Sequence, residues 1–453
     1  MISQLRLLFV VPATLALLAC TNPGGDGAAT RLNADLPPMN AFSRTAVQQP
    51  NRSNSSIARD ILLLTFQMEN GRKLSQLSRF EGPITIRVTG RKAPAVFDRD
   101  LDQLLARLRD EAGLAIKKVP SNQQAGLTIE LVRRSDIQQA VPSAACFVIP
   151  GIDSWRAYRL GQDRSAQDWA TLATRTKMAV FIPSDVSAQE MRDCLHEEVA
   201  QALGPVNDLY HLTDSVFNDD NFHTVLTGFD MLVLQAIYSS ELKSGMNQGQ
   251  VKTRLPAILA RLNPGGRNGG PGAPADTSRG WIRAIEEAAS AATSDKKRLQ
   301  AAKSAVAIAQ AVGWTDHRLA FSHYILARIA LNTDPRLALH SLAEANRLYR
   351  VSPDTQVHAA HVAVQVASYE LSVGRPERAE KITAEAIKTA RFAQNAGLLA
   401  NLLMLRAEAL DELGRVKEAE ALRLDSLGWA RYAFTDERAI RKRLTEVAAL
   451  REK

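Results

Sequence analysis

The segment 194–208, CLHEEVAQALGPVND, gathers side chains whose chemistry could serve a reaction. Apolar spacing predicts a helix over Ala188–Leu203. Two imidazoles four residues apart on a helix can share a metal ion beside a glutamate base. His196, however, is followed four residues later by Ala200, which cannot bind a metal. The alternative frame starts one residue later, at two neighbouring glutamates.

In that frame the segment resembles the metzincin zinc peptidases, whose pattern is H-E-x-x-H-x-x-G-x-x-H. Glu198 falls on the general base and Gly204 on the glycine turn, while the three ligand positions carry Glu197, Gln201 and Asn207. Amides are poor zinc ligands beside imidazole or thiolate. The resemblance therefore implies a vestigial motif with no catalytic residue, no metal and no cofactor. The alternatives are a hydrolase that uses Glu198 with an unconventional metal or none, and an unrelated helix with a chance glutamate pair.

The neighbouring segments fit the same resemblance. Met178–Ile182 is placed as the strand before the motif helix. Asp214–Asn218 falls where matrixins carry the Met-turn, with Phe217 at the methionine. Asp230–Tyr238 has the D-x-x-x-x-Q-x-x-Y pattern of their last helix. The resemblance thus covers roughly residues 83–243.

The remaining ionisable groups match no standard site. His211 and His223 flank Asn218–Asn221 and could gather with His196 round a metal, but loop histidines are more often solvated. The aspartates of that run lack the alternating ligands of an EF-hand. No phosphate-binding loop and no hydrolase elbow occurs in the sequence.

The N-terminus is typical of an exported protein. In residues 1–19, Arg6 precedes the apolar run Leu7–Leu18, which suits a signal peptide and is too short to span a bilayer, since that needs ~20 residues. The ending LLAC resembles a bacterial lipobox, which implies cleavage before Cys20 and a lipid partner on its sulfur. Thr21 instead of Asp implies the outer membrane, facing the periplasm. The alternative is an ordinary signal peptide with an incidental cysteine.

Two cysteines remain, Cys146 and Cys194. An even pair in an exported chain predicts a disulfide. Buried free thiols are the alternative. A nucleophilic cysteine is disfavoured, because no order of Cys, His and Asn here matches a protease signature.

Composition indicates a tether after Cys20 and disfavours both a later membrane span and a nucleic-acid partner. Residues 20–55 are polar and rich in small side chains, which predicts a disordered tether. No later stretch of 18 residues is apolar, so no membrane span is expected. The formal charge is +8, but no dense basic run is interleaved with aromatics, and export disfavours nucleic acid as a partner.

The chain divides at 263–280, a Gly- and Pro-rich linker. Before it, residues 56–262 mix helical and strand periodicities, which predicts an α+β domain, metzincin-like by resemblance. The other expected helices are Ile57–Met68 and Leu101–Leu108, and the other expected strands are Ile84–Val88, Leu127–Leu131 and Cys146–Ile149.

After the linker, residues 281–453 are predicted to be all helical, with repeats about 40 residues apart. Small residues recur at matching places, where helices of a hairpin cross closely: Ala327, Ala367 and Ala407; Ala338, Ala379 and Ala419; Ala386 and Ser426; and Gly374 and Gly414 between helices. The array resembles tetratricopeptide repeats, with a longer period than theirs, and the resemblance implies a protein partner in a groove. An ordinary helical bundle is the alternative.

The lipobox, the cysteine pair and the motif together resemble a bacterial family known only as domain of unknown function 2927, over about residues 60–245. No activity is established for that family. The leading hypothesis is therefore a lipid-anchored, non-catalytic binding scaffold of the cell envelope. The rivals are the Glu198 hydrolase and a purely structural envelope protein.

Overall fold

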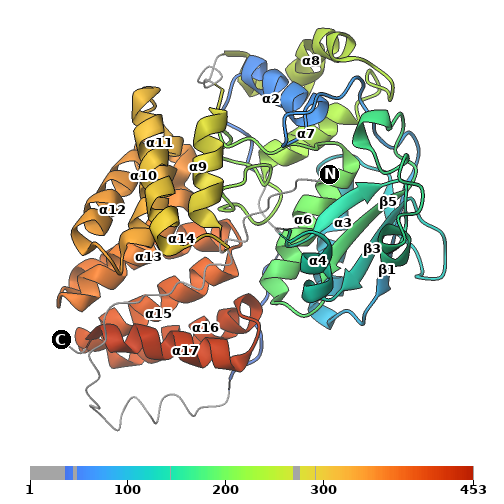
Figure 1. The fold of residues 1–453 in the computed structure, drawn as a ribbon. Coiled ribbons are helices and arrows are strands. Elements are labelled where there is room, and N and C mark those ends of the chain that lie inside the picture. Colours follow the sequence, from blue (N-terminus) through green and yellow to red (C-terminus); the bar gives the residue numbers. More distant parts are fainter. Residues whose placement is uncertain (1–35, 44–47, 143, 269–275, 291, 452–453) are drawn as a thin grey trace. The chain divides into compact units, whose positions relative to one another are not determined.

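The computed structural model describes residues 36–43, 48–142, 144–268, 276–290 and 292–451. The predicted signal peptide and Cys20 lie outside the described residues. The chain forms two compact units (Figure 1). The first, here called the N-terminal unit, comprises residues 48–186 and 190–276. The second, the helical unit, comprises residues 277–451 together with residues 36–43.

A five-stranded mixed sheet organises the N-terminal unit. Its strands are β1 (Ile84–Gly90), β2 (Ile116–Lys118), β3 (Leu127–Val132), β4 (Phe147–Pro150) and β5 (Met178–Pro183). They lie in the order β2-β1-β3-β5-β4, and only β4 runs antiparallel to its neighbour. Every residue of β4 and β5 is buried, as expected where helices cover both faces of a largely parallel sheet.

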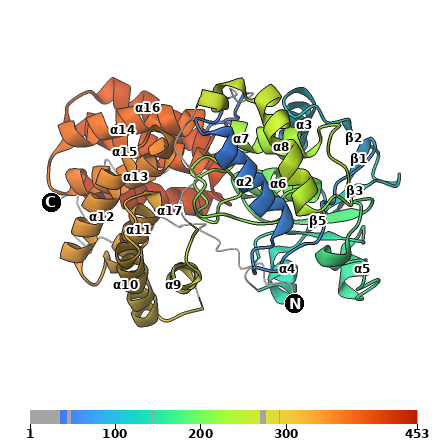
Figure 2. The same cartoon turned by 90° about the horizontal axis from the view of Figure 1, so that it is seen from above.

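Helices alternate with these strands, so the unit is α/β. The predicted mixture of helices and strands is present, but the two are not segregated as in an α+β domain. The helices are α2 (Asn54–Phe66), α3 (Ala95–Asp110), α4 (Arg134–Ala140), α5 (Trp155–Arg159), α6 (Ala188–Leu203), α7 (Gly228–Ile237) and α8 (Gln248–Leu262), with 3-10 turns η1 (Trp169–Thr171) and η2 (Pro264–Asn268). Each helix and strand expected from the sequence is present, with ends shifted by a few residues. Helix α2 lies beside α8, close to α7 (Figure 2).

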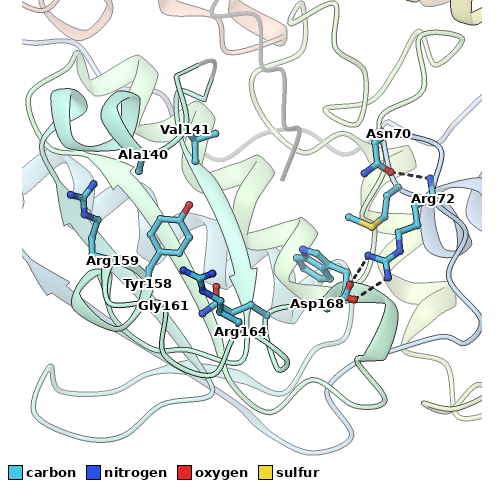
Figure 3. Close-up of a pocket in the computed structure, with 12 residues that line it drawn as sticks. Asn70, Arg72, Ala140, Val141, Tyr158, Arg159, Gly161, Arg164 and Asp168 are labelled. Atoms are coloured by element: carbon cyan, nitrogen blue, oxygen red, sulfur yellow. Dashed lines mark hydrogen bonds and ion pairs between the residues drawn. The ribbon is translucent and has the colours of Figure 1, made fainter. Parts of the chain in front are cut away.

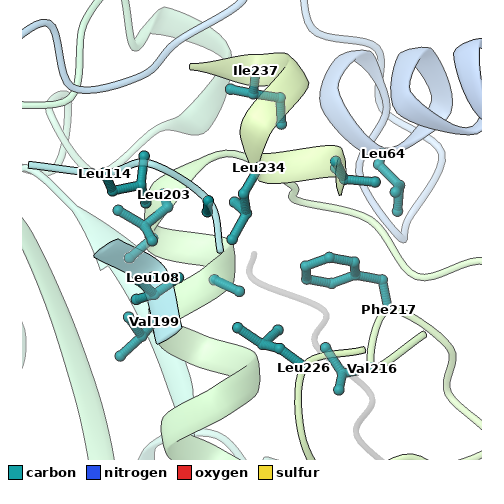
Figure 4. Packing of buried hydrophobic residues seen from close by; sticks show 14 of the residues in the cluster. Leu64, Leu108, Leu114, Val199, Leu203, Val216, Phe217, Leu226, Leu234 and Ile237 are labelled. Carbon is teal, nitrogen blue, oxygen red and sulfur yellow. The ribbon is translucent and has the colours of Figure 1, made fainter. Parts of the chain in front are cut away.

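The core of the N-terminal unit forms where α6 meets α7. Val199 and Leu203 of α6, and Leu234 and Ile237 of α7, are fully buried. Phe217, from the loop between these helices, is also fully buried in the same cluster (Figure 4). Burying one such side chain contributes about 1.5–3 kcal/mol. The motif helix is therefore part of the core.

The helical unit is all α-helix apart from its turns. Its helices are α9 (Arg279–Ala289), α10 (Asp295–Ala311), α11 (His317–Ala330), α12 (Pro335–Tyr349), α13 (Gln356–Ser372), α14 (Pro376–Phe392), α15 (Ala396–Glu412), α16 (Val416–Ala433) and α17 (Glu437–Ala448), with 3-10 turns η3 (Pro353–Thr355) and η4 (Ala449–Arg451). Figure 1 shows them following one another in order through the unit.

The recurring small residues explain the hairpins α11/α12, α13/α14 and α15/α16. Each of the predicted alanines, and Ser426, is buried, which lets paired helices approach closely. Gly374 and Gly414 have φ of 69° and 74° at the turns of two successive hairpins. That left-handed conformation favours glycine and ends the first helix of each hairpin.

Two segments differ from what the sequence suggests. Residues 36–43, within the predicted tether, contact α16 in the helical unit. The start of the predicted linker forms η2 instead of irregular chain. Just before it, Asn54 Nδ2 donates to the Asn263 carbonyl and Asn263 Nδ2 donates to Asn54 Oδ1, each at 3.0 Å. The two units divide at Asp276–Thr277, inside the predicted linker 263–280. In the part of the chain that the structure describes, no helix is long and apolar enough to cross a membrane.

Candidate functional site

The vestigial motif lies on α6 and in the turn that follows it. Glu198 is fully buried, Gln201 is 1% exposed and Asn207 is buried, whereas Glu197 is half-buried. A general base must reach the substrate proton directly or through one water. In this conformation the Glu198 carboxylate reaches no open surface.

The C-terminal end of α6 is held by a buried arginine. Arg175 Nη1 donates to the carbonyl of Gln201, and its Nη2 donates to Gly204 O at 2.7 Å. Its guanidinium also lies 5.2 Å from the ring of Trp169. Burial lowers the pKa of Arg175 to about 10, so it stays charged at neutral pH and neutralises the negative end of the helix.

The glycine of the motif serves packing. A Cβ atom on Gly204 would lie 2.7 Å from Cδ1 of Ile237, so any larger residue would make the Ile237 side chain shift where α6 ends against α7. Tyr238 Oη donates to Leu203 O at 2.9 Å. Burial raises the pKa of Tyr238 to about 12. Asn207 Nδ2 donates to Leu63 O of α2 at 3.1 Å, which ties the turn to a third helix.

The residue set does not fit a zinc site. Tetrahedral zinc in a peptidase needs three strong ligands and an open position. Gln201 and Asn207 offer only weak amide oxygens, and a hydrogen bond from Asn207 Nδ2 to Leu63 O orients that amide against α2. Among the described residues, no group of three or more His, Cys, Asp or Glu side chains is arranged to hold a metal ion.

The three histidines have separate partners. His196 Nδ1 accepts a hydrogen bond from Leu226 N at 3.1 Å. Burial holds the pKa of His196 well below its usual value, and Arg192 and Arg107 lower it further. His211 Nε2 lies 2.8 Å from Asp60 Oδ1. His223 Nε2 lies 2.9 Å from the carbonyl of residue 213. His196 and His211 are buried, so the expectation that loop histidines are solvated is wrong for His211.

A buried polar cluster, which sequence reasoning missed, surrounds His211. Arg52 donates to Asp60 at 2.6 Å and to Asp214 at 2.9 Å, and its guanidinium lies 4.1 Å from the Phe229 ring. Asp60 is fully buried, so it needs both partners. Arg52 falls in the polar segment before α2, where nothing in the local pattern marks it as a core residue.

Asp230 anchors the loop in the predicted Met-turn position. Its carboxylate accepts hydrogen bonds from Ser215 Oγ, from Val216 N at 3.2 Å and from Thr227 N at 2.8 Å. Burial raises the pKa of Asp230 to about 6, against the opposing effect of these bonds. The first residue of the D-x-x-x-x-Q-x-x-Y pattern therefore holds the loop that contains Phe217.

The predicted disulfide is confirmed. Cys146, just before β4, is bonded to Cys194 of α6, with Cα atoms 6.0 Å apart. The bond joins the antiparallel edge of the sheet to the motif helix across 48 residues of sequence. It therefore fixes α6 against the sheet.

A cavity of about 640 Å³ lies elsewhere in the N-terminal unit (Figure 3). Arg72, Arg159 and Arg164 line it with a single acid, Asp168. Arg72 bonds Asp168 through both Nη atoms at 2.8 and 2.9 Å. A backbone hydrogen bond from Ala170 lowers the pKa of Asp168, and the bond from Arg72 adds to this. The lining can attract an anionic group, and it includes none of the motif residues.

The fold and its site thus define an α/β unit with a buried acidic motif, followed by repeated helical hairpins. Residues 54–257 match the model of a family described as Protein of unknown function (DUF2927). This match supports the predicted family for the N-terminal unit and supplies no activity. The comparisons with curated proteins and with solved structures gave no match.

Proposed function

We propose that this protein is a lipid-anchored, non-catalytic binding scaffold of the bacterial cell envelope. Its N-terminal unit is a metzincin-like pseudoenzyme, and its helical unit binds a protein through tetratricopeptide-like hairpins. The observation that carries the proposal is the complete burial of Glu198 on α6. A side chain that would have to serve as the base is packed inside the unit.

The metzincin-like assignment is supported by the order of the elements. Strand β5 leads into α6, and the loop with Phe217 leads into α7, as the motif resemblance implies. Asn207, which falls on a ligand position of the pattern, bonds the backbone of α2. Asp230, which begins the D-x-x-x-x-Q-x-x-Y pattern, bonds its preceding loop. The rival hydrolase would have to expose Glu198, and that requires α6 to leave the core.

The anchor is proposed from the N-terminal sequence alone. The run LLAC ending at Cys20, followed by Thr21, favours an outer-membrane lipoprotein that faces the periplasm. The disulfide between Cys146 and Cys194 supports an oxidising compartment. The lipobox resemblance implies a diacylglycerol on the Cys20 sulfur and an acyl chain on its amine. A single acyl chain anchors weakly and two or more anchor stably, so this modification would suffice to hold the protein.

Two measurements test the two halves of the proposal. Cys20→Ser should move the protein from the membrane pellet to the soluble fraction, whereas Cys146→Ser should leave it in the pellet. A Cys20→Ser protein that stays in the pellet overturns the anchor. Peptidase assays with a general protein substrate should show no turnover above background. Turnover that Glu198→Gln abolishes would replace the scaffold with the hydrolase.

A further inference from the structure

Residues 36–43, LPPMNAFS, form an extended segment on the helical unit, here called the strap. The strap has no helix or strand of its own. Asn40 and Phe42 are half-buried, while Met39, Ala41 and Ser43 are exposed. This alternation is typical of an extended chain that turns every second side chain toward a surface.

The helical unit contacts the main chain of the strap along its length. Three hydrogen bonds do this: Arg431 Nη1 to Pro37 O at 2.8 Å, Asn40 N to Gly428 O at 3.0 Å, and Gln394 Nε2 to Ser43 O at 2.8 Å. Bonds to main-chain atoms hold an extended peptide whatever its sequence, and pockets for alternate side chains add specificity.

The Asn40 side chain is bound by Asp425 of α16. Its Nδ2 donates to Asp425 Oδ1 at 3.0 Å and to Asp425 O at 3.3 Å. Arg391 holds the other carboxylate oxygen of Asp425 at 2.6 Å. A Cβ atom on Gly428 would lie 2.7 Å from the Asn40 amide, so the glycine creates the space that the amide fills.

Phe42 contacts two aromatic residues of the same helix. Its ring stacks on Trp429 with centroids 4.3 Å apart, and it meets the edge of Tyr432 at 6.1 Å. Aromatic pairs of this geometry add to the gain from burial alone. Asparagine and phenylalanine, two residues apart, are therefore both recognised by α16.

We propose that this surface, here called the α16 site, is a peptide-binding site for an extended segment with Asn followed two residues later by Phe. The α16 site consists of Arg391, Gln394, Asp425, Gly428, Trp429, Arg431 and Tyr432. The strap is its built-in occupant, and a partner segment with the same Asn-x-Phe pattern displaces it. The proposal rests on the proposed function only in assigning protein binding to the helical unit.

The strap is a tethered occupant that a partner must outcompete. Pro37 and Pro38 restrict its backbone before binding, which reduces the ordering cost and favours the bound strap. Because the strap belongs to the same chain, its binding is intramolecular and it competes with any free segment at an effective concentration. A partner segment with the same contacts must therefore exceed that effective concentration or add contacts of its own. The strap thus sets an affinity threshold for partners.

The test uses a fluorescently labelled peptide of sequence LPPMNAFS and the full chain. Asn40→Ala combined with Phe42→Ala should vacate the α16 site, and the vacated chain should bind the peptide at least ~10-fold more tightly than wild type, where the strap competes. Adding Gly428→Ala should weaken that binding at least ~10-fold, because the new Cβ takes the space of the amide. Gly397→Ala is the control, because a Cβ atom at residue 397 would lie 3.7 and 3.9 Å from its nearest neighbouring atoms. Adding it should leave peptide binding unchanged.

A second measurement does not depend on the vacated chain. Chymotrypsin should cut after Phe42 faster in Gly428→Ala than in wild type or Gly397→Ala, because the new Cβ displaces Asn40 and releases the strap. Weaker helix formation cannot explain such a result, since alanine is the better helix former. Absence of peptide binding to the folded, vacated chain, or equal binding with Gly428→Ala, overturns the α16 site. If wild type is a dimer and the Asn40→Ala, Phe42→Ala chain is a monomer, the strap contacts α16 of a second copy. That result would also overturn the α16 site. None of these failures bears on the anchor or on Glu198, which have their own tests.

Discussion

Helices α6 and α16 both carry acidic side chains that could take part in binding or chemistry, but these side chains have opposite surroundings. In α6 the motif residues Glu198 and Gln201 are buried and Glu197 is half-buried, and Asn207 in the turn that follows bonds α2. In α16 the less conspicuous Asp425 and Trp429 contact an extended segment that arrives from far away in the sequence. The comparison teaches that side chains which stand out as a motif can be buried in packing, whereas contacts to a distant segment form on a helix that no motif marks.

The largest expected effect comes from the bond that fixes α6. Cys146→Ala or Cys194→Ala should lower the free energy of unfolding by about 4 kcal/mol in the chain-entropy model, because the loop between them is no longer closed. Thermal and urea denaturation of each variant measure this. A change below about 1 kcal/mol would mean that α6 is held without the disulfide.

Arg175 gives the next largest effect. Arg175→Met removes the donors that bond the carbonyls of Gln201 and Gly204, and we expect a loss of about 3 kcal/mol, because those buried carbonyls are left without a partner. Arg72→Met is the control. It breaks an exposed pair with Asp168 and should cost less than about 1 kcal/mol. Equal losses for the two variants would contradict the role of Arg175 at the end of α6.

Much of this arrangement follows from the sequence, for physical reasons that also mark the limits. Strands such as β3 and β5 are β-branched runs, and α6 has clear helical spacing, so local pattern suffices for them. Strand β2 has one buried residue and two exposed lysines, and such a short strand carries no periodicity. Local pattern predicts Glu198 as a candidate but not its burial, since burial depends on elements that are distant in the sequence. The contact between Asn40 and α16 is non-local, so no local pattern contains it.

Acid should affect the helical unit through His358. Burial lowers the pKa of His358 to about 3, so below pH ~6.5 the unfolded chain binds a proton that the folded chain refuses. The resulting stability is present at neutral pH and is lost as pH falls, by about 1.4 kcal/mol per pH unit, or about 2 kcal/mol from pH 6.5 to 5. The melting temperature of wild type should therefore fall between pH 6.5 and pH 5. His358→Phe should reduce this fall, and the control His340→Gln, at an exposed histidine, should not. An unchanged pH dependence in His358→Phe would refute the assignment.

Asp230 should act with the opposite sign in the N-terminal unit. Its pKa of about 6 lies above that of an unfolded aspartate, near 3.9. The folded chain therefore binds the extra proton between pH ~6 and ~4, and this group stabilises the fold as pH falls through that window. Asp230→Asn should remove that gain, which is about 2 kcal/mol between pH 7 and pH 4.5 from the difference in pKa. Denaturation at pH 7 and pH 4.5 measures the difference. A wild-type-like pH response in the variant would contradict the role of Asp230.

The smallest expected effect is on Glu198 itself, and it leads to the central test. Glu198→Gln keeps the size and shape of the side chain, so the free energy of unfolding should change by about 1 kcal/mol or less. The deciding measurement is the zinc content of the purified full chain, prepared without chelators and then offered zinc, by elemental analysis. Because the ligand positions hold Glu197, Gln201 and Asn207, we predict far less than one zinc per chain, with Glu198→Gln giving the same value. One tightly held zinc per chain that is lost when Glu197, Gln201 and Asn207 are replaced by alanine would contradict the account.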